Sequence, residues 1–141
     1  MAGTDAADTR TVLVIDDEPP TVELLTDMLT TQGFRMLSAL DGQRGIDIAR
    51  AQRPDLIVLD LVMPELTGFD VVRELRRFPE SREIPILIFS VKDLSPEERE
   101  RLRGSVQAVV TKGAMADLLR ELARVQAADG RRGGLAAGER V

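Results

Sequence analysis

The sequence predicts an α/β fold in which a five-stranded parallel sheet is doubly wound, with helices on both faces. Short, uninterrupted runs of aliphatic residues alternate along the chain with segments whose apolar residues recur at helical spacing. An uninterrupted apolar run suits a strand that is buried on both faces, as in a parallel sheet between helices. Strict alternation of strands and helices favours right-handed crossovers, so all strands should end at the same edge of the sheet.

The first two strand–helix units occupy the first third of the chain. Residues 11–15 form the first expected strand. Pro19 begins the helix after it, because proline fits the first turn of a helix, and Gly33 ends that helix. A second strand is expected over 34–39, and a weakly amphipathic helix then runs to about Gln52.

The third and fourth units contain the longest apolar runs. The third strand is expected over 54–60, and the helix that follows the next loop over 69–78. The fourth strand covers 85–89. Ser95 is a strong helix start, since proline and two glutamates follow it, and that helix ends at Gly104.

The fifth unit completes the domain. A strand is expected over 106–110, followed by a helix with an apolar stripe that ends near Ala128. We therefore expect one domain over 11–128, a flexible leader over 1–10 and a disordered tail over 129–141. No DNA-binding domain is expected after the last helix.

Composition excludes several kinds of chemistry. The chain has 141 residues and a formal net charge of −5, with no cysteine and no histidine. These absences exclude disulfides, thiolate metal sites, cysteine nucleophiles and Ser-His-Asp triads. The mild negative charge gives no sign of a nucleic-acid surface. Neither a signal peptide nor a membrane-length apolar run is evident, which favours a cytoplasmic protein without membrane insertion.

Polar side chains follow four of the expected strands. They are Asp16, Asp17 and Glu18 after the first strand, Asp60 after the third, Ser90 after the fourth and Lys112 after the fifth. Carboxylates this close repel unless a cation screens them, and oxygen ligands favour a hard cation such as Mg²⁺. A carboxylate oxygen could then attack phosphorus while the metal and Lys112 neutralise the phosphoryl oxygens.

Each of these residues also has an ordinary interpretation. Asp16 and Asp17 could be charges at a helix N-terminus, Ser90 a loop serine and Lys112 a solvated surface charge. The coincidence of all of them at one sheet edge favours a functional site.

Four motifs, in this order, resemble the receiver domain of two-component response regulators. They are Val-Leu-Val-Ile-Asp-Asp-Glu at 12–18, Pro-Asp-Leu-Ile-Val-Leu-Asp-Leu-Val-Met-Pro at 54–64 with Gly68 after it, Ile-Phe-Ser at 88–90 and Thr-Lys-Gly at 111–113. The resemblance covers about residues 11–127. It implies the flavodoxin-like (βα)5 fold with strand order 2-1-3-4-5, in a stand-alone or hybrid-kinase-type receiver.

The resemblance also implies a metal site. Asp17 and Asp60 would bind Mg²⁺ directly, with the backbone carbonyl of Val62 as a third protein ligand. Asp16 would act largely through water.

The same resemblance assigns a phosphoryl site and a signalling role. Asp60 would accept a phosphoryl group from the phosphohistidine of a sensor histidine kinase or phosphotransfer protein. Lys112 would contact the phosphate, and Ser90 would be the hydroxyl that moves toward it. The domain would assist its own phosphorylation and dephosphorylation without being an enzyme, and would signal to a downstream protein, as a monomer or weak dimer. The fourth helix, fifth strand and fifth helix would form the partner surface.

Three positions differ from the usual family pattern. Gly113 follows Lys112 where the family usually has proline, and Val109 stands where the family has a switch aromatic. Val91 follows Ser90 where a small residue is preferred.

Two alternatives to a phosphorylatable receiver stay open. One is a non-phosphorylated pseudo-receiver that serves as an adaptor. The other is a Mg²⁺-dependent phosphatase with an aspartyl-phosphate intermediate, which would want an acid two residues past Asp60, where Val62 stands.

Overall fold

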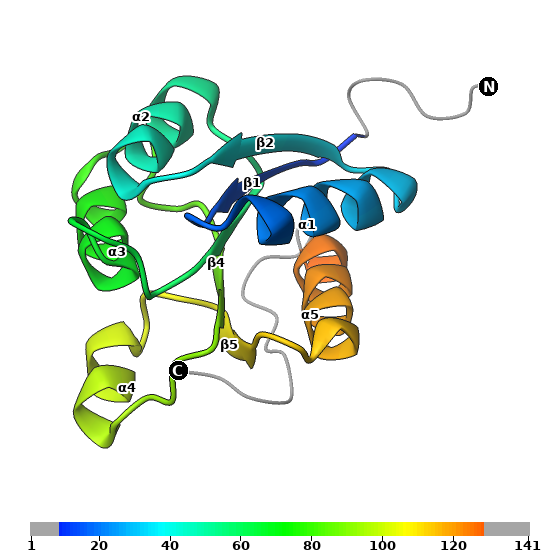
Figure 1. Cartoon of the computed structure of the whole chain (residues 1–141). Helices are drawn as coiled ribbons and strands as arrows, with labels where there is room; N and C mark the ends of the chain where they lie inside the picture. The colour runs from blue at the N-terminus through cyan, green and yellow to red at the C-terminus, as the bar shows by residue number, and fades with distance from the viewer. Residues whose placement is uncertain (1–8, 129–141) are drawn as a thin grey trace.

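The computed structural model describes residues 9–128, over which five strands alternate with five helices (Figure 1). The strands are β1 (Thr11–Ile15), β2 (Arg35–Ala39), β3 (Leu56–Leu59), β4 (Ile86–Ser90) and β5 (Ala108–Thr111). The helices are α1 (Pro19–Thr31), α2 (Gly42–Gln52), α3 (Gly68–Arg77), α4 (Pro96–Leu102) and α5 (Met115–Ala128). The expected leader, apart from residues 9 and 10, and the expected tail lie outside the described residues. Across residues 9–128, no helix is both long enough and apolar enough to cross a membrane.

The strands form one parallel sheet in the order β2-β1-β3-β4-β5. Val14 of β1, for example, pairs with Ser38 on one side and with Val58 on the other. This order confirms the predicted fold class and its strand order. Because all five strands are parallel, their carboxyl ends meet at one edge.

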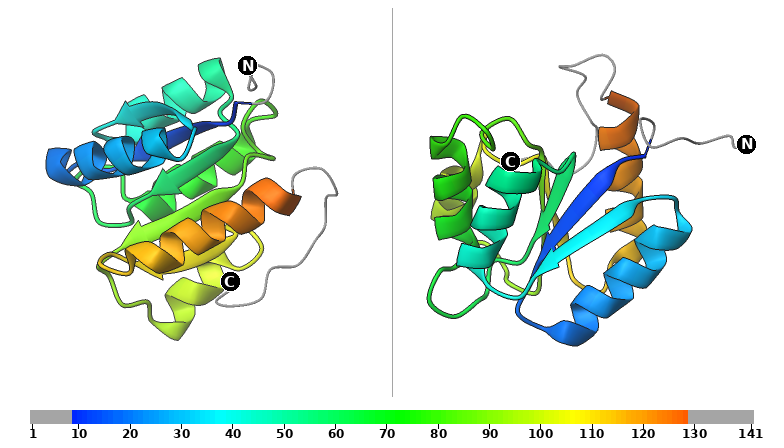
Figure 2. Two further views of the ribbon diagram at one scale, coloured as in Figure 1. Left: turned by 90° about the vertical axis from the view of Figure 1, so that its right-hand side faces the viewer. Right: turned by 90° about the horizontal axis from the view of Figure 1, so that it is seen from above.

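Helices cover both faces of the sheet (Figure 2), and the sheet separates two hydrophobic cores, one on each face. Leu13 and Ile15 of β1 point to the core beneath α2, α3 and α4, whereas Val12 and Val14 point to the core beneath α1 and α5. Successive side chains of a strand face opposite ways, so a run of consecutive aliphatic residues supplies both cores.

The starts of α1 and α4 follow the predicted signals, whereas α3 begins one residue earlier than expected, at Gly68. Proline occupies the first turn of α1, as expected from Pro19. In α4 the Ser95 hydroxyl accepts a hydrogen bond from the Glu98 backbone, and the Glu98 side chain accepts one from the Ser95 backbone. Thr67 and Asp70 form the same reciprocal pair at the start of α3. Such capping boxes satisfy amide groups that the first helical turn leaves without partners.

The last two strands lie slightly later in the chain than expected. Ser90 is the final residue of β4, and β5 begins at Ala108 although the sequence suggested 106. Val106 is buried among core residues ahead of the strand, which explains why the apolar run extends beyond the ladder. The shift places Lys112 directly after β5.

A guanidinium group fixes the connections around β4. Arg76 of α3 donates hydrogen bonds to the backbone carbonyl of Ser105, at 3.1 Å from Nε and 2.6 Å from Nη2. Its Nη1 atom donates to the carbonyls of Arg82 and Ile84, both at 2.9 Å. Arg76 therefore ties the segment after α4 to the segment before β4.

Candidate functional site

The sheet fixes the backbone of three predicted site residues. The Asp16 N–H donates to the Ala39 carbonyl at 3.1 Å, and the Asp60 N–H donates to the Ile15 carbonyl at 3.0 Å. The Lys112 N–H donates in the same way to the Ser90 carbonyl at 2.9 Å. Each residue thus continues the ladder by one hydrogen bond, so the three side chains meet at the carboxyl edge.

Lys112 lies between carboxylates from two strands. Its Nζ atom is 2.9 Å from Asp16 Oδ2, 2.9 Å from Glu18 Oε1 and 3.0 Å from Asp60 Oδ2. The Lys112 side chain is only 12% exposed. Burial alone would lower the pKa of Lys112, but its hydrogen bonds to the three carboxylates outweigh burial and raise the pKa. Lys112 is therefore a permanent cation in this pocket.

Both carboxylate oxygens of Asp60 have partners. Oδ1 accepts hydrogen bonds from the Ser90 hydroxyl at 2.6 Å and from the Val62 N–H at 3.1 Å, while Oδ2 faces Lys112. Gly68 packs so closely against the backbone beside Asp60 that a Cβ atom at this position would overlap the Asp60 carbonyl oxygen and Leu61. The carboxylate is thus held in one orientation by donors that could equally serve the oxygens of a transferred group.

The acids of the site are arranged to attract a cation. Asp16, Asp17 and Asp60 offer carboxylate oxygens that all lie within 4.8 Å of one another. Burial raises the pKa of Asp16, and the charge of Asp60 raises it further, while hydrogen bonds from Lys112 and the Glu18 N–H act in the opposite sense. A hard divalent cation with oxygen ligands would relieve this repulsion, so the donor set fits Mg²⁺.

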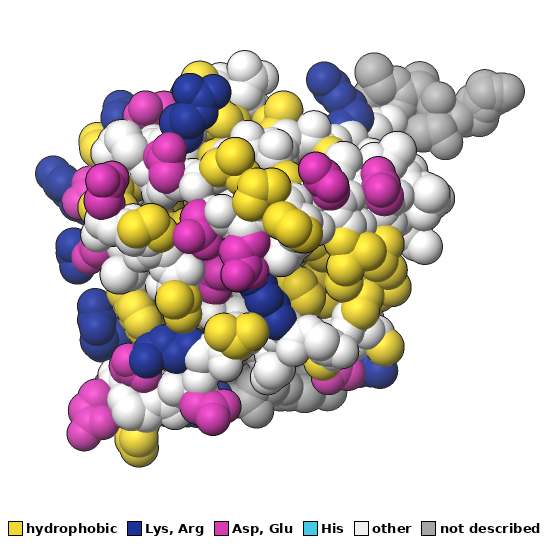
Figure 3. Space-filling model, in the orientation of Figure 1, with side chains coloured by type: hydrophobic (Ala, Val, Ile, Leu, Met, Phe, Trp, Pro, Cys, Tyr) yellow, Lys and Arg dark blue, Asp and Glu magenta, His cyan; other side chains and the backbone are white. Residues whose placement is uncertain are grey.

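The structure brings together the five predicted side chains, Asp16, Asp17, Asp60, Ser90 and Lys112. Figure 3 shows acidic side chains beside a basic one near the centre of this face, bordered by hydrophobic side chains. Glu18 was expected at the same strand end but without a role of its own, although its carboxylate contacts Lys112. The only signal in the sequence was its place directly after the two aspartates. Metal binding by the Val62 carbonyl stays a prediction.

The three departures from the family pattern lie on the segments that carry this site. Gly113 has φ +97°, a conformation that glycine adopts freely, and the Lys112–Gly113 bond is trans, like every other described peptide bond. Val91 is 66% exposed beside Ser90, and Val109 is partly buried on β5.

Residues 12–124 match the family model described as the response regulator receiver domain. Protein PilH of Pseudomonas aeruginosa is 36% identical over 96 residues, which cover 68% of this chain and 77% of PilH. The probable transcriptional regulatory protein TcrX of Mycobacterium tuberculosis is 38% identical over 102 residues. That match covers 72% of this chain, but the chain spans only 43% of the length of TcrX.

A solved structure extends the likeness to the fold. The receiver domain of the sensor histidine kinase PA1611 from Pseudomonas aeruginosa is 27% identical, with a TM-score of 0.75. The match covers 84% of this chain and 98% of that domain. In that structure a magnesium ion is coordinated in the active-site cleft.

Proposed function

Because the chain belongs to the response regulator receiver domain family, we propose that it accepts a phosphoryl group on Asp60 and signals through the resulting change of surface. The donor is the phosphohistidine of a sensor histidine kinase or phosphotransfer protein. The observation that carries this proposal is the position of Lys112, whose Nζ contacts Asp16 and Asp60 at once. A fixed cation at this point can neutralise negative charge as it develops on a phosphoryl group.

In the proposed transfer, a carboxylate oxygen of Asp60 attacks the phosphorus atom. A P–O bond forms as the P–N bond of the donor breaks, and the electron pair returns to the donor imidazole. Lys112 and the Ser90 hydroxyl, which now contact Asp60, then contact phosphoryl oxygens. Positioning and charge neutralisation supply most of the catalysis in phosphoryl transfer, so the transfer needs no general base.

Mg²⁺ is the proposed cofactor. Asp17 and Asp60 would hold it directly with the Val62 carbonyl, and Asp16 would act mainly through water. The cluster of three carboxylates supports this assignment, as does the magnesium ion in the cleft of the related PA1611 receiver. When bound, the ion would offset the charge of the carboxylates and of the phosphoryl oxygens.

Exposed apolar side chains support donor docking around the site. Leu40, Val62 and Val91, which are 48%, 51% and 66% exposed, follow β2, β3 and β4 at the same edge as Asp60. Apolar groups gathered around a polar centre are typical of interaction surfaces. A cytoplasmic location, expected from the sequence, is part of the same proposal.

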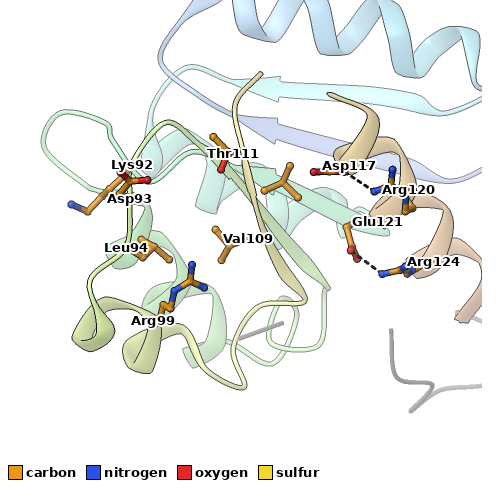
Figure 4. Close-up of a pocket in the computed structure, with 11 residues that line it drawn as sticks. Lys92, Asp93, Leu94, Arg99, Val109, Thr111, Asp117, Arg120, Glu121 and Arg124 are labelled. Atoms are coloured by element: carbon orange, nitrogen blue, oxygen red, sulfur yellow. Dashed lines mark hydrogen bonds and ion pairs between the residues drawn. The ribbon is translucent and has the colours of Figure 1, made fainter. Parts of the chain in front are cut away.

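The surface formed by α4, β5 and α5 is proposed to bind the downstream protein. A groove of about 420 Å³ lies there, with Lys92 and Arg99 on one side and Arg120 and Arg124 on the other (Figure 4). Val109 lies between these two sides. Arg120 pairs with Asp117 at 2.6 Å and Arg124 with Glu121 at 3.0 Å, so α5 presents paired charges to a partner.

Incubation with acetyl phosphate or phosphoramidate and Mg²⁺, followed by intact-mass measurement, tests the proposal. We expect a phosphoryl adduct in the wild type and in Asp47→Asn, which changes an exposed aspartate of α2. We expect none in Asp60→Asn. Absence of any adduct on the wild type would instead support the adaptor, and rapid multiple-turnover phosphate release would support the phosphatase.

A further inference from the structure

We infer that Lys92 is a positioning residue that couples the state of Asp60 to the first turn of α4. This inference rests on the proposed function, since it concerns the response of the fold to a phosphoryl group on Asp60. Lys92 contacts neither Asp60 nor the acidic cluster directly, and acts through Ser90 on one side and Glu98 on the other.

The first half of the connection runs from the site into the β4–α4 loop. The Ser90 hydroxyl donates to Asp60 Oδ1 at 2.6 Å, and the Lys92 backbone N–H approaches the same hydroxyl oxygen at 3.4 Å. The Ser90 side chain is buried, so its hydroxyl has few other partners available. A movement of this hydroxyl toward a phosphoryl oxygen therefore also moves the backbone at Lys92.

The second half runs from Lys92 to the start of α4. The Lys92 Nζ atom is 3.1 Å from Glu98 Oε2, while Glu98 Oε1 accepts the Ser95 N–H at 2.9 Å. The hydrogen bond from Ser95, together with Lys92, lowers the pKa of Glu98, which stays ionised at neutral pH. One carboxylate thus holds both the loop lysine and the helix cap.

The position of this connection gives it an effect on the proposed partner surface. Lys92 and Arg99 line the same groove, so a displacement of the loop and of the first turn of α4 changes its shape (Figure 4). Val109, which also lines that groove, stands where the family pattern has a switch aromatic, so this chain has no ring there that could rotate. The Lys92–Glu98 ion pair provides a route that needs no aromatic side chain.

Amide NMR spectra of the full chain, with and without beryllofluoride and Mg²⁺ as the phosphoryl mimic, test the inference. In the wild type we expect shifts at Ser90, at Lys112 and through α4. In Lys92→Met the shifts at Ser90 and Lys112 should stay, while those in α4 should fall at least two-fold. Lys92→Arg, which keeps the charge, should restore them.

Two further variants separate coupling from simple destabilisation. Glu98→Gln keeps a side-chain oxygen for the Ser95 N–H but loses the charge, so it should act like Lys92→Met even if that variant folds poorly. Arg103→Met breaks the exposed Arg103–Glu100 pair at the other end of α4 and should leave the response unchanged.

Undiminished α4 shifts in Lys92→Met or Glu98→Gln would overturn the inference, as would a wild type that responds at Ser90 but not in α4. A wild type without any shift at Ser90 or Lys112 would instead overturn the proposed function itself.

Discussion

Replacing Lys112 by methionine removes the cation that contacts Asp16, Glu18 and Asp60 while keeping an apolar stem of similar length. Asp16 and Asp60 are 2% and 3% exposed and would lose the ammonium group that lies 2.9 and 3.0 Å from them. Breaking a buried ion pair from one side costs about 3–5 kcal/mol. Because Glu18, the third carboxylate at Lys112, is 61% exposed to solvent, we expect a loss at the lower end, about 3 kcal/mol of unfolding free energy.

Urea unfolding at pH 7, in EDTA and again with excess Mg²⁺, measures this loss. The raised pKa of Lys112 means that its stabilising effect is fully present below its unfolded value of 10.5 and is lost only at higher pH, so pH 7 is suitable. Mg²⁺ should stabilise Lys112→Met more than the wild type, because the cation replaces the missing charge. Lys92→Met, the same change at the chain's other lysine, is the control and should cost much less.

An unfolding free energy for Lys112→Met within about 0.5 kcal/mol of the wild type in EDTA would refute the reasoning, since surface changes typically have effects of that size. Equal stabilisation of both proteins by Mg²⁺ would show that Lys112 and the metal do not respond to the same carboxylates.

Three further changes test other parts of the site. Asp16→Asn should raise the unfolding free energy at neutral pH without metal, because the raised pKa of Asp16 means that the folded state disfavours its ionised form. In urea unfolding this gain should vanish below about pH 3.8, where the carboxyl group of Asp16 is protonated in both states. A loss of stability at pH 7 would contradict this prediction. Gly68→Ala should cost about 1–3 kcal/mol, because its Cβ would overlap the backbone at Asp60 and Leu61, and should slow adduct formation in the mass assay; normal stability and rate would show that α3 can shift freely. Thr67→Ala removes the α3 cap and should cost about 1 kcal/mol by thermal unfolding, whereas Thr67→Ser should lose little.

The sheet and the convergence of distant side chains at its edge could be predicted from the sequence, because both follow from local patterns. One aliphatic run ends in Asp16 and another in Asp60. These two runs are enough to predict that the two carboxylates lie together, because parallel strands end at the same edge of the sheet. The possibility that Asp16 was merely a helix-start charge could not be excluded by local sequence. The contact with Lys112, 96 residues away, decides against it.

Contacts that depend on rotamers and loop paths could not be predicted. Glu18 reaches Lys112, and Lys92 reaches Glu98, only because of the directions taken by the segments after β1 and β4. No sequence pattern predicted that Arg76 would donate a hydrogen bond to the carbonyl of Ser105. The expected start of β5 was two residues too early for a related reason. Val106 is apolar because it packs into the core, but it precedes the first strand residue, Ala108.

The contact between Arg76 and Ser105 also limits how α4 can move. Ser105 lies just past the end of this seven-residue helix, and two nitrogens of one guanidinium hold its carbonyl. A displacement that begins at Ser95 would therefore tilt α4 about its carboxyl end, with the largest travel at the first turn and the smallest at Leu102. A partner that senses this tilt would gain most by binding next to Ser95.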